Sequence, residues 1–194
     1  MIDQRDVTAC LVTRGDQPDM MKLIRASLIF DQVIVWDNSR DVDWKCAGRY
    51  AAAKIAPTTL VYFQDDDVVV PEATQRALLA EYEWPIVANY GHGTNPDGYD
   101  DLPLVCGGAI ADRDTVWECI GRYSEQYDLD DAFMYEADFA VGVLYPKFKH
   151  VHLPFGINLE VAQHESRLCN QPWQRDLKFK VTERARAIRD LVTA

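Results

Sequence analysis

The sequence predicts an α/β domain in which helices flank a mostly parallel sheet. Short apolar runs rich in β-formers alternate with helical segments through the first half of the chain, and this alternation is typical of a parallel, doubly wound sheet. The 194 residues are 48% hydrophobic, which is enough for one sizeable core. No repeat or clear linker divides the chain. We therefore expect a single compact domain over residues 1–194.

Four strands and three helices are expected in the first half. The strands are apolar runs that end in turn residues or acids, and the helices begin with proline or are rich in alanine. The expected strands are 7–13, 32–39, 59–64 and 85–91, and the expected helices are 18–29, 46–55 and 71–83.

The second half begins with a stretch dense in Gly, Pro, Asn and Asp, over 91–103, which predicts a long loop of the kind that often forms a lid or binding segment. An acidic segment later in this half contains a helix, with Glu136 and Asp138 expected near its start. The other expected elements are an extended segment over 104–113, a helix over 114–127, a strand over 150–157 and a final helix over 176–192.

Charge and cysteine usage limit the class of protein. The net charge is −11 and no basic stripe is present, so we expect no nucleic-acid partner. An acidic protein that binds a phosphorylated small molecule needs a divalent metal or a few placed arginines. The five cysteines are scattered without a C-x-x-C pair, which favours reduced thiols in a cytoplasmic protein. No apolar run reaches the roughly 18 to 20 residues of a membrane span, and the start does not resemble a signal peptide.

The stretch "TLVYFQDDDVVVP" places three aspartates, Asp65, Asp66 and Asp67, at the end of an expected buried strand. Like charges this close cost free energy unless a cation or several donors compensate them. In an extended segment Asp65 and Asp67 would point one way, and two carboxylates on one side suit Mg²⁺ or Mn²⁺, with water and substrate phosphates completing the shell. The alternative is a solvated turn that caps the following helix.

Two families share this acidic signature. Asp65, Asp67 and Val69 formally match the D-x-D-x-[TV] motif of haloacid-dehalogenase phosphatases, although that motif ends the first strand and here it follows the third. The D-x-D motif also resembles that of nucleotide-sugar glycosyltransferases of the GT-A type, which have a Rossmann-like fold. A catalytically silent GT-A domain that only binds a partner or glycan is a third possibility.

The GT-A resemblance extends over most of the chain. "VTACLVTRGDQPDMMKLIRASLIFDQVIVWDNSRD" is similar to the opening of that family, and "GRYAAAKIAPTTLVYFQDDDVVVP" is similar to its small-residue helix and D-x-D strand. "LVCGGAIADRDTVWECI" resembles the glycine-bearing acceptor segment, and "YEADFAVGVLY" occupies the place of the later acidic motif. The aspartate run, the GGA segment and the acidic helix together look most like the exostosin-like branch. The resemblance implies a nucleotide-binding half over 1–90 and an acceptor half with a C-terminal arm over 91–194.

The resemblance also implies a function and a set of site residues. The function is metal-dependent transfer of a hexosyl or N-acetylhexosaminyl group from a nucleotide sugar, most simply a UDP sugar, to a hydroxyl of a glycan, protein or small-molecule acceptor. The metal, Mn²⁺ or Mg²⁺, would be bound by Asp67 with Asp65 and His164, and Asp66 could replace Asp67 because the triplet leaves the register ambiguous. Donor-binding roles fall on Thr13, Arg14, Asp37, Asn38, Arg49, Lys54, Asp65, Asp66, Gly107, Gly108 and Arg175.

The catalytic role falls on Asp138, with Glu136 as the alternate. In an inverting enzyme this carboxylate would be the general base toward the acceptor hydroxyl. In a retaining enzyme it would instead position the donor sugar and stabilise an oxocarbenium-like state. The structural alternative is an acid that the helix macrodipole favours near a helix start.

Overall fold

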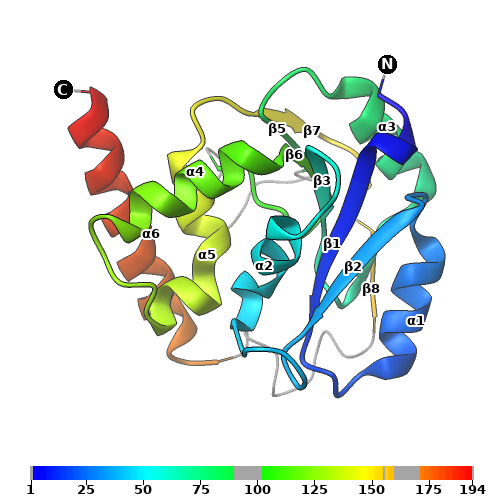
Figure 1. Cartoon of the computed structure of the whole chain (residues 1–194), viewed down its shortest axis with the longest axis horizontal. Coiled ribbons are helices and arrows are strands. Elements are labelled where there is room, and N and C mark those ends of the chain that lie inside the picture. The colour runs from blue at the N-terminus through cyan, green and yellow to red at the C-terminus, as the bar shows by residue number, and fades with distance from the viewer. Residues whose placement is uncertain (1, 90–101, 155, 160–170, 194) are drawn as a thin grey trace.

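A mixed six-stranded sheet lies between two layers of helices in the computed structural model, which describes residues 2–89, 102–154, 156–159 and 171–193 (Figure 1). The strand order is β2-β1-β3-β6-β5-β7. The strands are β1 (Val7–Thr13), β2 (Gln32–Asp37), β3 (Leu60–Phe63), β5 (Ile86–Asn89), β6 (Ala109–Asp112) and β7 (Lys149–Val151). The short strands β4 (Val68–Val69) and β8 (Ile157–Asn158) form a separate antiparallel pair.

The sheet is mostly parallel, as the sequence predicts, but β6 runs against its neighbours. β1 pairs in parallel with β2 and β3, and β5 pairs in parallel with β7. β6 is antiparallel to both β3 and β5. The apolar pattern of a buried strand is the same in either direction, so the sequence predicted an extended segment here without its orientation.

The helices cover both faces of the sheet (Figure 1). Alternate residues of the strands enter two different clusters, because side chains along a strand point to opposite faces. Cys10, Val61 and Phe63 belong to the cluster on the face covered by α2, α4, α5 and α6. Ala9 and Tyr62 belong to the cluster with α3, and Leu11 packs with α1. The helices are α1 (Pro18–Ser27), α2 (Gly48–Lys54), α3 (Glu72–Glu81), α4 (Arg113–Ser124), α5 (Asp131–Leu144) and α6 (Gln174–Thr193).

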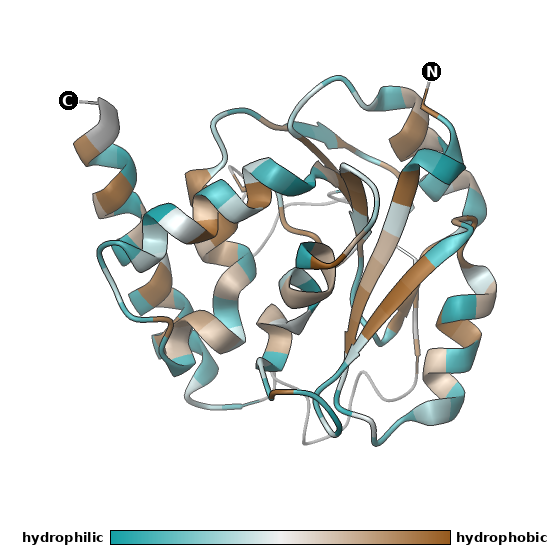
Figure 2. Cartoon of the chain, in the orientation of Figure 1, coloured by the Kyte–Doolittle hydropathy of each residue, from teal (hydrophilic) through white to brown (hydrophobic). Residues whose placement is uncertain are grey.

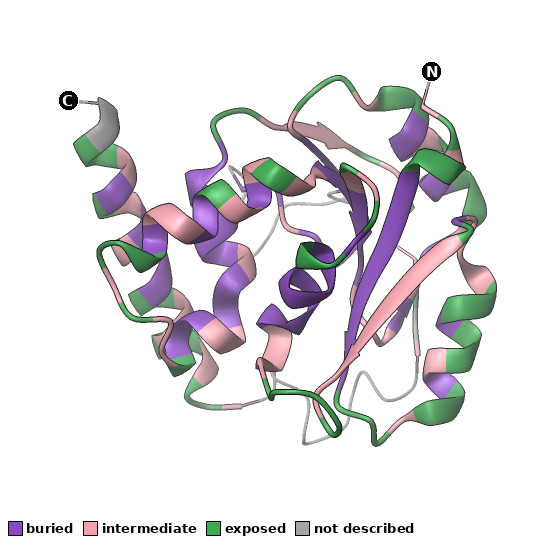
Figure 3. Cartoon of the chain, viewed as in Figure 1, coloured by how far each residue is buried: buried purple, intermediate pink, exposed green. Residues whose placement is uncertain are grey.

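The central strands are apolar and the outward helix faces are polar (Figure 2). β1 is buried throughout, whereas β2, at one edge of the sheet, is half-buried along its length (Figure 3). Burial on both faces explains why β1 reads as a continuous apolar run rather than an alternating one. The apolar runs therefore predict the middle of the sheet correctly.

Helix α5 differs from its expected position. It begins at Asp131, so Glu136 and Asp138 lie in its middle rather than near its start. The backbone at Glu136 is non-helical, with φ −123° and ψ 28°, and this kink divides the helix. Asp138 consequently lies in the first turn of the second helical segment. Within the described residues, no helix combines the length and the apolar character needed to cross a bilayer.

Candidate functional site

The polar ends of several strands meet at one edge of the sheet. β1, β2, β3 and β5 run in the same direction, so their carboxyl ends lie together, and the antiparallel β6 begins at that same edge. Phe63 at the end of β3 pairs with Ala109 at the start of β6. In open α/β sheets, ligands bind in the crevice beyond the carboxyl ends of the strands. This edge is therefore the natural place for a site.

The aspartate triplet (Asp65–Asp67) lies at this edge, between β3 and β4. Asp66 and Asp67 form a turn rather than an extended segment, so strand alternation does not decide where their side chains point. The fully buried Gln64 fixes this turn, because its amide nitrogen donates to the carbonyl of Val68 at 2.7 Å. The backbone N–H of Asp65 reaches the carbonyl of Cys106 at 3.4 Å, which ties the triplet to the segment before β6.

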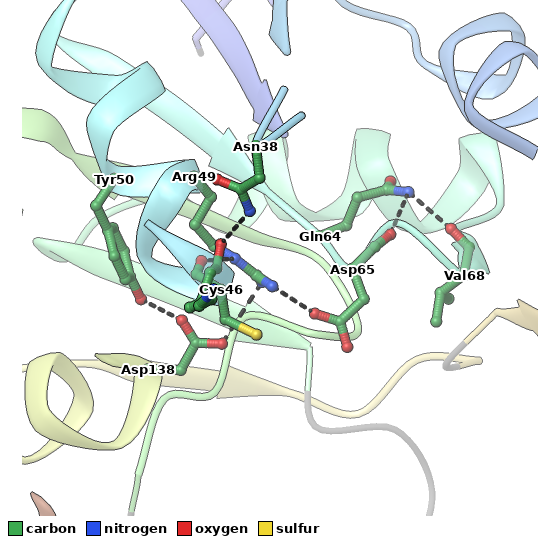
Figure 4. Close-up of polar contacts among 9 residues, drawn as sticks. Asn38, Cys46, Arg49, Tyr50, Gln64, Asp65, Val68 and Asp138 are labelled. Carbon is green, nitrogen blue, oxygen red and sulfur yellow. Dashed lines mark hydrogen bonds and ion pairs between the residues drawn. The ribbon is translucent and has the colours of Figure 1, made fainter. Parts of the chain in front are cut away.

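Arg49 is a buried cation that links the triplet to α5 (Figure 4). Its side chain is 4% exposed, and its Nη2 donates to Asp65 Oδ1 at 2.9 Å. Its Nη1 lies 3.5 Å from Asp138 Oδ2 without forming a hydrogen bond there or elsewhere in the described structure. Burial alone would lower the pKa of Arg49, but Asp138 and Asp65 raise it well above its usual value, so the guanidinium stays charged.

The close packing of α2 on the sheet positions Arg49. A Cβ at Gly48 would lie 2.6 Å from a methyl of Val12 and 2.8 Å from the ring of Trp36, so only glycine permits this approach. The side chain of the next residue along α2 is thereby held beside the end of β3.

Asp138 is held by α2 through both of its oxygens. Tyr50, the residue after Arg49, donates a hydrogen bond to Asp138 Oδ1 at 2.6 Å. Burial raises the pKa of Asp138, although Arg49 and the Tyr50 hydroxyl act in the opposite direction. The Asp138 side chain remains 18% exposed, so it is still accessible from solvent.

Glu136, the alternate catalytic candidate, is more enclosed than Asp138. It is 3% exposed at the kink of α5, and Gln174 at the start of α6 donates to its Oε1 at 2.7 Å. Burial raises the pKa of Glu136 to about 7. Between the two acids, Asp138 has the better access to a bound molecule.

The charges at this edge are unbalanced. Arg49 is surrounded by carboxylates, and burial together with the charge of Asp65 raises the pKa of Asp66 to about 7. A raised pKa of this size means that the site favours added positive charge or protons.

The hard carboxylate oxygens are of the kind that Mg²⁺ and Mn²⁺ prefer. No three His, Cys, Asp or Glu side chains within the described ranges are arranged to hold a metal ion. A metal here would thus rely on two protein carboxylates, with water and phosphate oxygens completing its shell.

The predicted residues Thr13, Asp37 and Asn38, at the ends of β1 and β2, lie at the same edge. Their polar atoms form hydrogen bonds within the loops that follow these strands. Asp37 Oδ1 accepts hydrogen bonds from the backbone and hydroxyl of Ser39, which lower its pKa. The Asn38 amide donates to the carbonyl of Lys45 and accepts from the N–H of Trp44.

Thr13 is buried at the end of β1 and accepts a hydrogen bond from the N–H of Gly15 at 3.1 Å. Its backbone carbonyl also accepts from the N–H of Asn38, which joins the ends of β1 and β2. The polar atoms of Thr13, Asp37 and Asn38 therefore support the loops of this edge.

Three predicted basic residues have different surroundings from Arg49. Arg14 is exposed and pairs with Asp16 at 2.8 Å. Lys54 ends α2, and its ammonium lies 4.5 Å from the ring centre of Trp117, on α4. Arg175 is exposed in the first turn of α6, next to the Gln174 that contacts Glu136. The predicted metal ligand His164 lies outside the described residues.

Gly107 and Gly108 lie where β6 enters the site. The Gly107 carbonyl accepts a hydrogen bond from the side-chain amide of Asn89. The Gly108 carbonyl accepts one from the backbone N–H of the same Asn89. Gly108 has φ +97°, a conformation that favours glycine, and a Cβ there would lie 3.0 Å from the Tyr62 hydroxyl. Gly108 thus lets the segment before β6 pack closely against Tyr62 of β3.

The sequence did not identify three residues that shape the site, namely Tyr50, Gln64 and Gln174. Tyr50 belongs to an alanine-rich helix, so the sequence suggests a core residue. Its polar contact depends on a single hydroxyl that reaches Asp138, which only the structure shows. Gln64 and Gln174 have no charge and no motif. Each could have been noticed only because it is the sequence neighbour of a predicted residue, namely Arg49, Asp65 or Arg175.

A separate hollow of about 410 Å³ lies between the N-terminal segment and α3. It contains none of the carboxylates around Arg49, and its two arginines, Arg5 and Arg76, are already paired with Asp3 and Glu72. We therefore assign the candidate site to the Arg49 cluster, which comprises Arg49, Tyr50, Asp65–Asp67, Glu136 and Asp138.

Comparison with solved structures defines the class of fold. The chain has a GT-A-like α/β fold of the kind that nucleotidyltransferases also share. No family model matches the chain, and no curated protein matches its sequence.

The matching structures are distant in sequence but cover most of the chain. The protein Aq1419 of Aquifex aeolicus VF5 aligns with a TM-score of 0.53 at 11% identity, over 82% of this chain and 95% of that one. The 4-diphosphocytidyl-2C-methyl-D-erythritol synthase of Anaerococcus prevotii also aligns with a TM-score of 0.53 at 11% identity, over 93% and 98%. Residues 1–349 of TarS from S. aureus align with a TM-score of 0.51 at 12% identity, over 92% and 70%. TarS 1–349 has also been solved in complex with UDP-GlcNAc.

Proposed function

We propose that this protein is a metal-dependent glycosyltransferase that moves a hexosyl or N-acetylhexosaminyl group from a UDP sugar to a hydroxyl acceptor. The GT-A-like fold gives the framework for this proposal. The resemblance to the exostosin-like branch suggests the transferred group, the metal dependence and the role of each residue.

The observation that carries the proposal is the buried Arg49, whose Nη1 makes no hydrogen bond among the described residues although it lies in an ion pair with Asp138. Its side chain is 4% exposed, and its Nη1 has no hydrogen-bond partner within the described structure. A buried polar group without a partner costs about 1–3 kcal/mol, so a ligand oxygen that accepts from Nη1 would be favoured. A diphosphate supplies such oxygens, and a divalent ion would relieve its repulsion from the triplet.

The chain's own residues then divide the tasks. Arg49 binds an oxygen of the diphosphate, and Asp67 with Asp65 would hold Mn²⁺ or Mg²⁺. The metal, when bound, supplies Lewis acidity toward the departing UDP. Asp138 acts on the acceptor side, where it either accepts the proton of the acceptor hydroxyl or orients the donor sugar.

The comparisons support a nucleotide sugar as the donor. TarS shares the fold at a TM-score of 0.51 and binds UDP-GlcNAc. The phosphatase alternative has less support, because its motif requires the acids to follow the first strand and Asp65 follows β3. A silent GT-A domain that binds without transfer remains the second candidate, since no three-ligand metal group is present within the described residues.

Calorimetric titration of UDP tests the proposal directly. We expect clear binding heat in the presence of Mn²⁺ and much weaker binding in EDTA. Asp67→Ala, alone or with Asp66→Ala, should abolish this metal dependence. Asp19→Ala is the matched control, because the Asp19 side chain is 91% exposed on α1, where it pairs with Lys22. If UDP binds equally well in EDTA, the proposal fails.

A panel of UDP sugars separates the enzyme from the silent domain. The enzyme hydrolyses at least one of them slowly in the absence of an acceptor, and this activity is lost in Asp138→Asn. Metal-dependent UDP binding without any hydrolysis would instead indicate the silent binding domain.

A further inference from the structure

Tyr50 makes the shortest hydrogen bond among the described residues of the Arg49 cluster. Its hydroxyl lies 2.6 Å from Asp138 Oδ1, and the residue is 1% exposed on α2 (Figure 4). A hydrogen bond to a carboxylate at this distance belongs to the strong, charge-assisted class.

The Tyr50 ring is held firmly by its packing. It contacts the ring of Phe63 edge-on, with centroids 5.2 Å apart, and belongs to the main core cluster. Because the ring is enclosed, the hydroxyl cannot move away from Asp138 without disturbing that core. The position of Asp138 Oδ1 is therefore set by a side chain that is itself fixed.

The second oxygen of Asp138 is in a different situation. Oδ2 lies 3.5 Å from Arg49 Nη1, in an ion pair in which Nη1 makes no hydrogen bond. Consecutive residues of one helix thus contact the two oxygens of the same carboxylate. One contact is a short hydrogen bond and the other is a looser charge contact.

We propose that Tyr50 is a positioning residue that fixes the carboxylate plane of Asp138, so that Oδ2 stays available to the bound substrates. This inference rests on the proposed function, because it assigns Asp138 to the acceptor side of the reaction. It holds for both roles of Asp138, since a base and a sugar-orienting group both depend on the direction of the carboxylate. Misplacement of a reacting group by about 1 Å can cost on the order of a hundredfold in rate.

The charged and titratable groups that act on Asp138 come from several segments, and besides the three named next they include Cys46, Cys106, Glu136 and Tyr145. Arg49 and Tyr50 approach it from α2, and Asp65 acts on it from the end of β3. Removal of the Tyr50 hydroxyl leaves the two charged groups in place. Its effect can therefore be separated from a general change in the charge of the site.

Tyr50→Phe is the test, with Tyr123→Phe as the matched control. Tyr123 is fully buried, and its hydroxyl contacts Arg184 Nη1 at 3.4 Å, away from Asp138. For Tyr50→Phe we expect kcat for UDP-sugar turnover to fall about 10- to 100-fold, with the Kd for UDP and Mn²⁺ within twofold of the wild type. The acidic limb of the pH profile should move upward by about one unit, because the charged form of Asp138 loses a hydrogen bond. Tyr123→Phe should change none of these.

A spectroscopic measurement separates this inference from the proposed function. The carboxyl resonance of Asp138 in protein labelled with ¹³C-aspartate, assigned from its loss in Asp138→Asn, reports the pKa without turnover. An upward shift in Tyr50→Phe alone supports the positioning role, even if no UDP sugar is a substrate. An unchanged Asp138 titration and unchanged kcat in Tyr50→Phe, or equal losses in both variants, would overturn it.

Discussion

Arg49 shows how one side chain can organise a site from distant parts of the sequence. It connects Asp65, at the end of β3, with Asp138, in the middle of α5. Replacement of either carboxylate would leave a buried cation partly uncompensated, which is costly in a low-dielectric interior. The sequence indicated Arg49 through its resemblance to GT-A enzymes, but not its link to Asp138, because that link depends on tertiary packing.

Gly108→Ala is predicted to destabilise the protein. The residue has φ +97°, and the added methyl would lie 3.0 Å from the Tyr62 hydroxyl and 3.3 Å from a methyl of Leu78. We expect the free energy of unfolding in urea to fall by about 1–3 kcal/mol. Gly121→Ala is the control, because nothing lies within 4 Å of its added Cβ in α4. It should raise the same free energy by up to about 1 kcal/mol, and a loss as large as that of Gly108→Ala would contradict the strain argument.

At the scale of elements, the contact between α5 and α6 encloses one side of the site. Gln174 begins α6 and donates to Glu136 at the kink of α5, while Val181, Ala185 and Ile188 of α6 enter the main core cluster. The sequence predicted a helix in each of these segments, one that contains Glu136 and Asp138 and a final one over 176–192. It did not predict the kink, since a local break at Glu136 leaves the pattern of apolar residues unchanged.

The buried Glu136 predicts a pH dependence of stability. Burial raises its pKa from the usual 4.5 to about 7, so the folded protein binds more protons than the unfolded chain between these values. The free energy of unfolding should therefore fall as the pH rises through this window, and the loss should be complete above about pH 7. Asp66, with its pKa also raised to about 7, contributes in the same direction.

Glu136→Gln isolates the contribution of Glu136. The variant keeps an oxygen that can accept from Gln174 but cannot ionise, so its melting temperature should vary less between pH 5 and pH 8 than that of the wild type. At pH 8 it should be the more stable protein. The exposed Glu118 on α4 supplies the control substitution, Glu118→Gln. An equal pH dependence in the wild type and Glu136→Gln would show that Glu136 is not the source.

At the scale of the whole molecule, the fold was predictable because the alternation of apolar strands and amphipathic helices is dense and regular. The bounds of β1, β2, β3 and β5 agree with the expected strands within a few residues, and β1 agrees completely with the expected 7–13. The expected strand over 150–157 is wrong, because β7 ends at Val151 and β8, which begins at Ile157, belongs to the separate pair. The direction of β6 was not predictable, because it does not depend on periodicity. A turn at the triplet was only the stated alternative, and the observed turn at Asp66–Asp67 leads into β4 instead of capping a helix. The sequence named the triplet, Arg49 and Asp138 as candidates, and the structure brings Arg49 next to Asp65 and Asp138, whereas the uncharged neighbours Tyr50, Gln64 and Gln174 needed the structure.

The net charge of −11 gives a prediction for cations in the absence of nucleotide. Added KCl should raise the melting temperature slightly by screening the repulsion among acids. Mn²⁺ at equal ionic strength should raise it by a further few degrees, because a ligand that binds only the native state stabilises it. Asp67→Ala should remove the extra effect of Mn²⁺ and keep that of KCl. If Mn²⁺ and KCl act alike on the wild type, the triplet does not bind the metal on its own.

The reversed direction of β6 has a further consequence for how such a protein can diversify. Three neighbouring strands leave the sheet at the edge that bears Arg49, whereas β6 enters there, so the connection from β5 to β6 both departs from and returns to the same rim. The described end of that connection, residues 102–108, touches the triplet, because the carbonyl of Cys106 accepts from the N–H of Asp65. A change of length ahead of it would leave the register of every strand as it is.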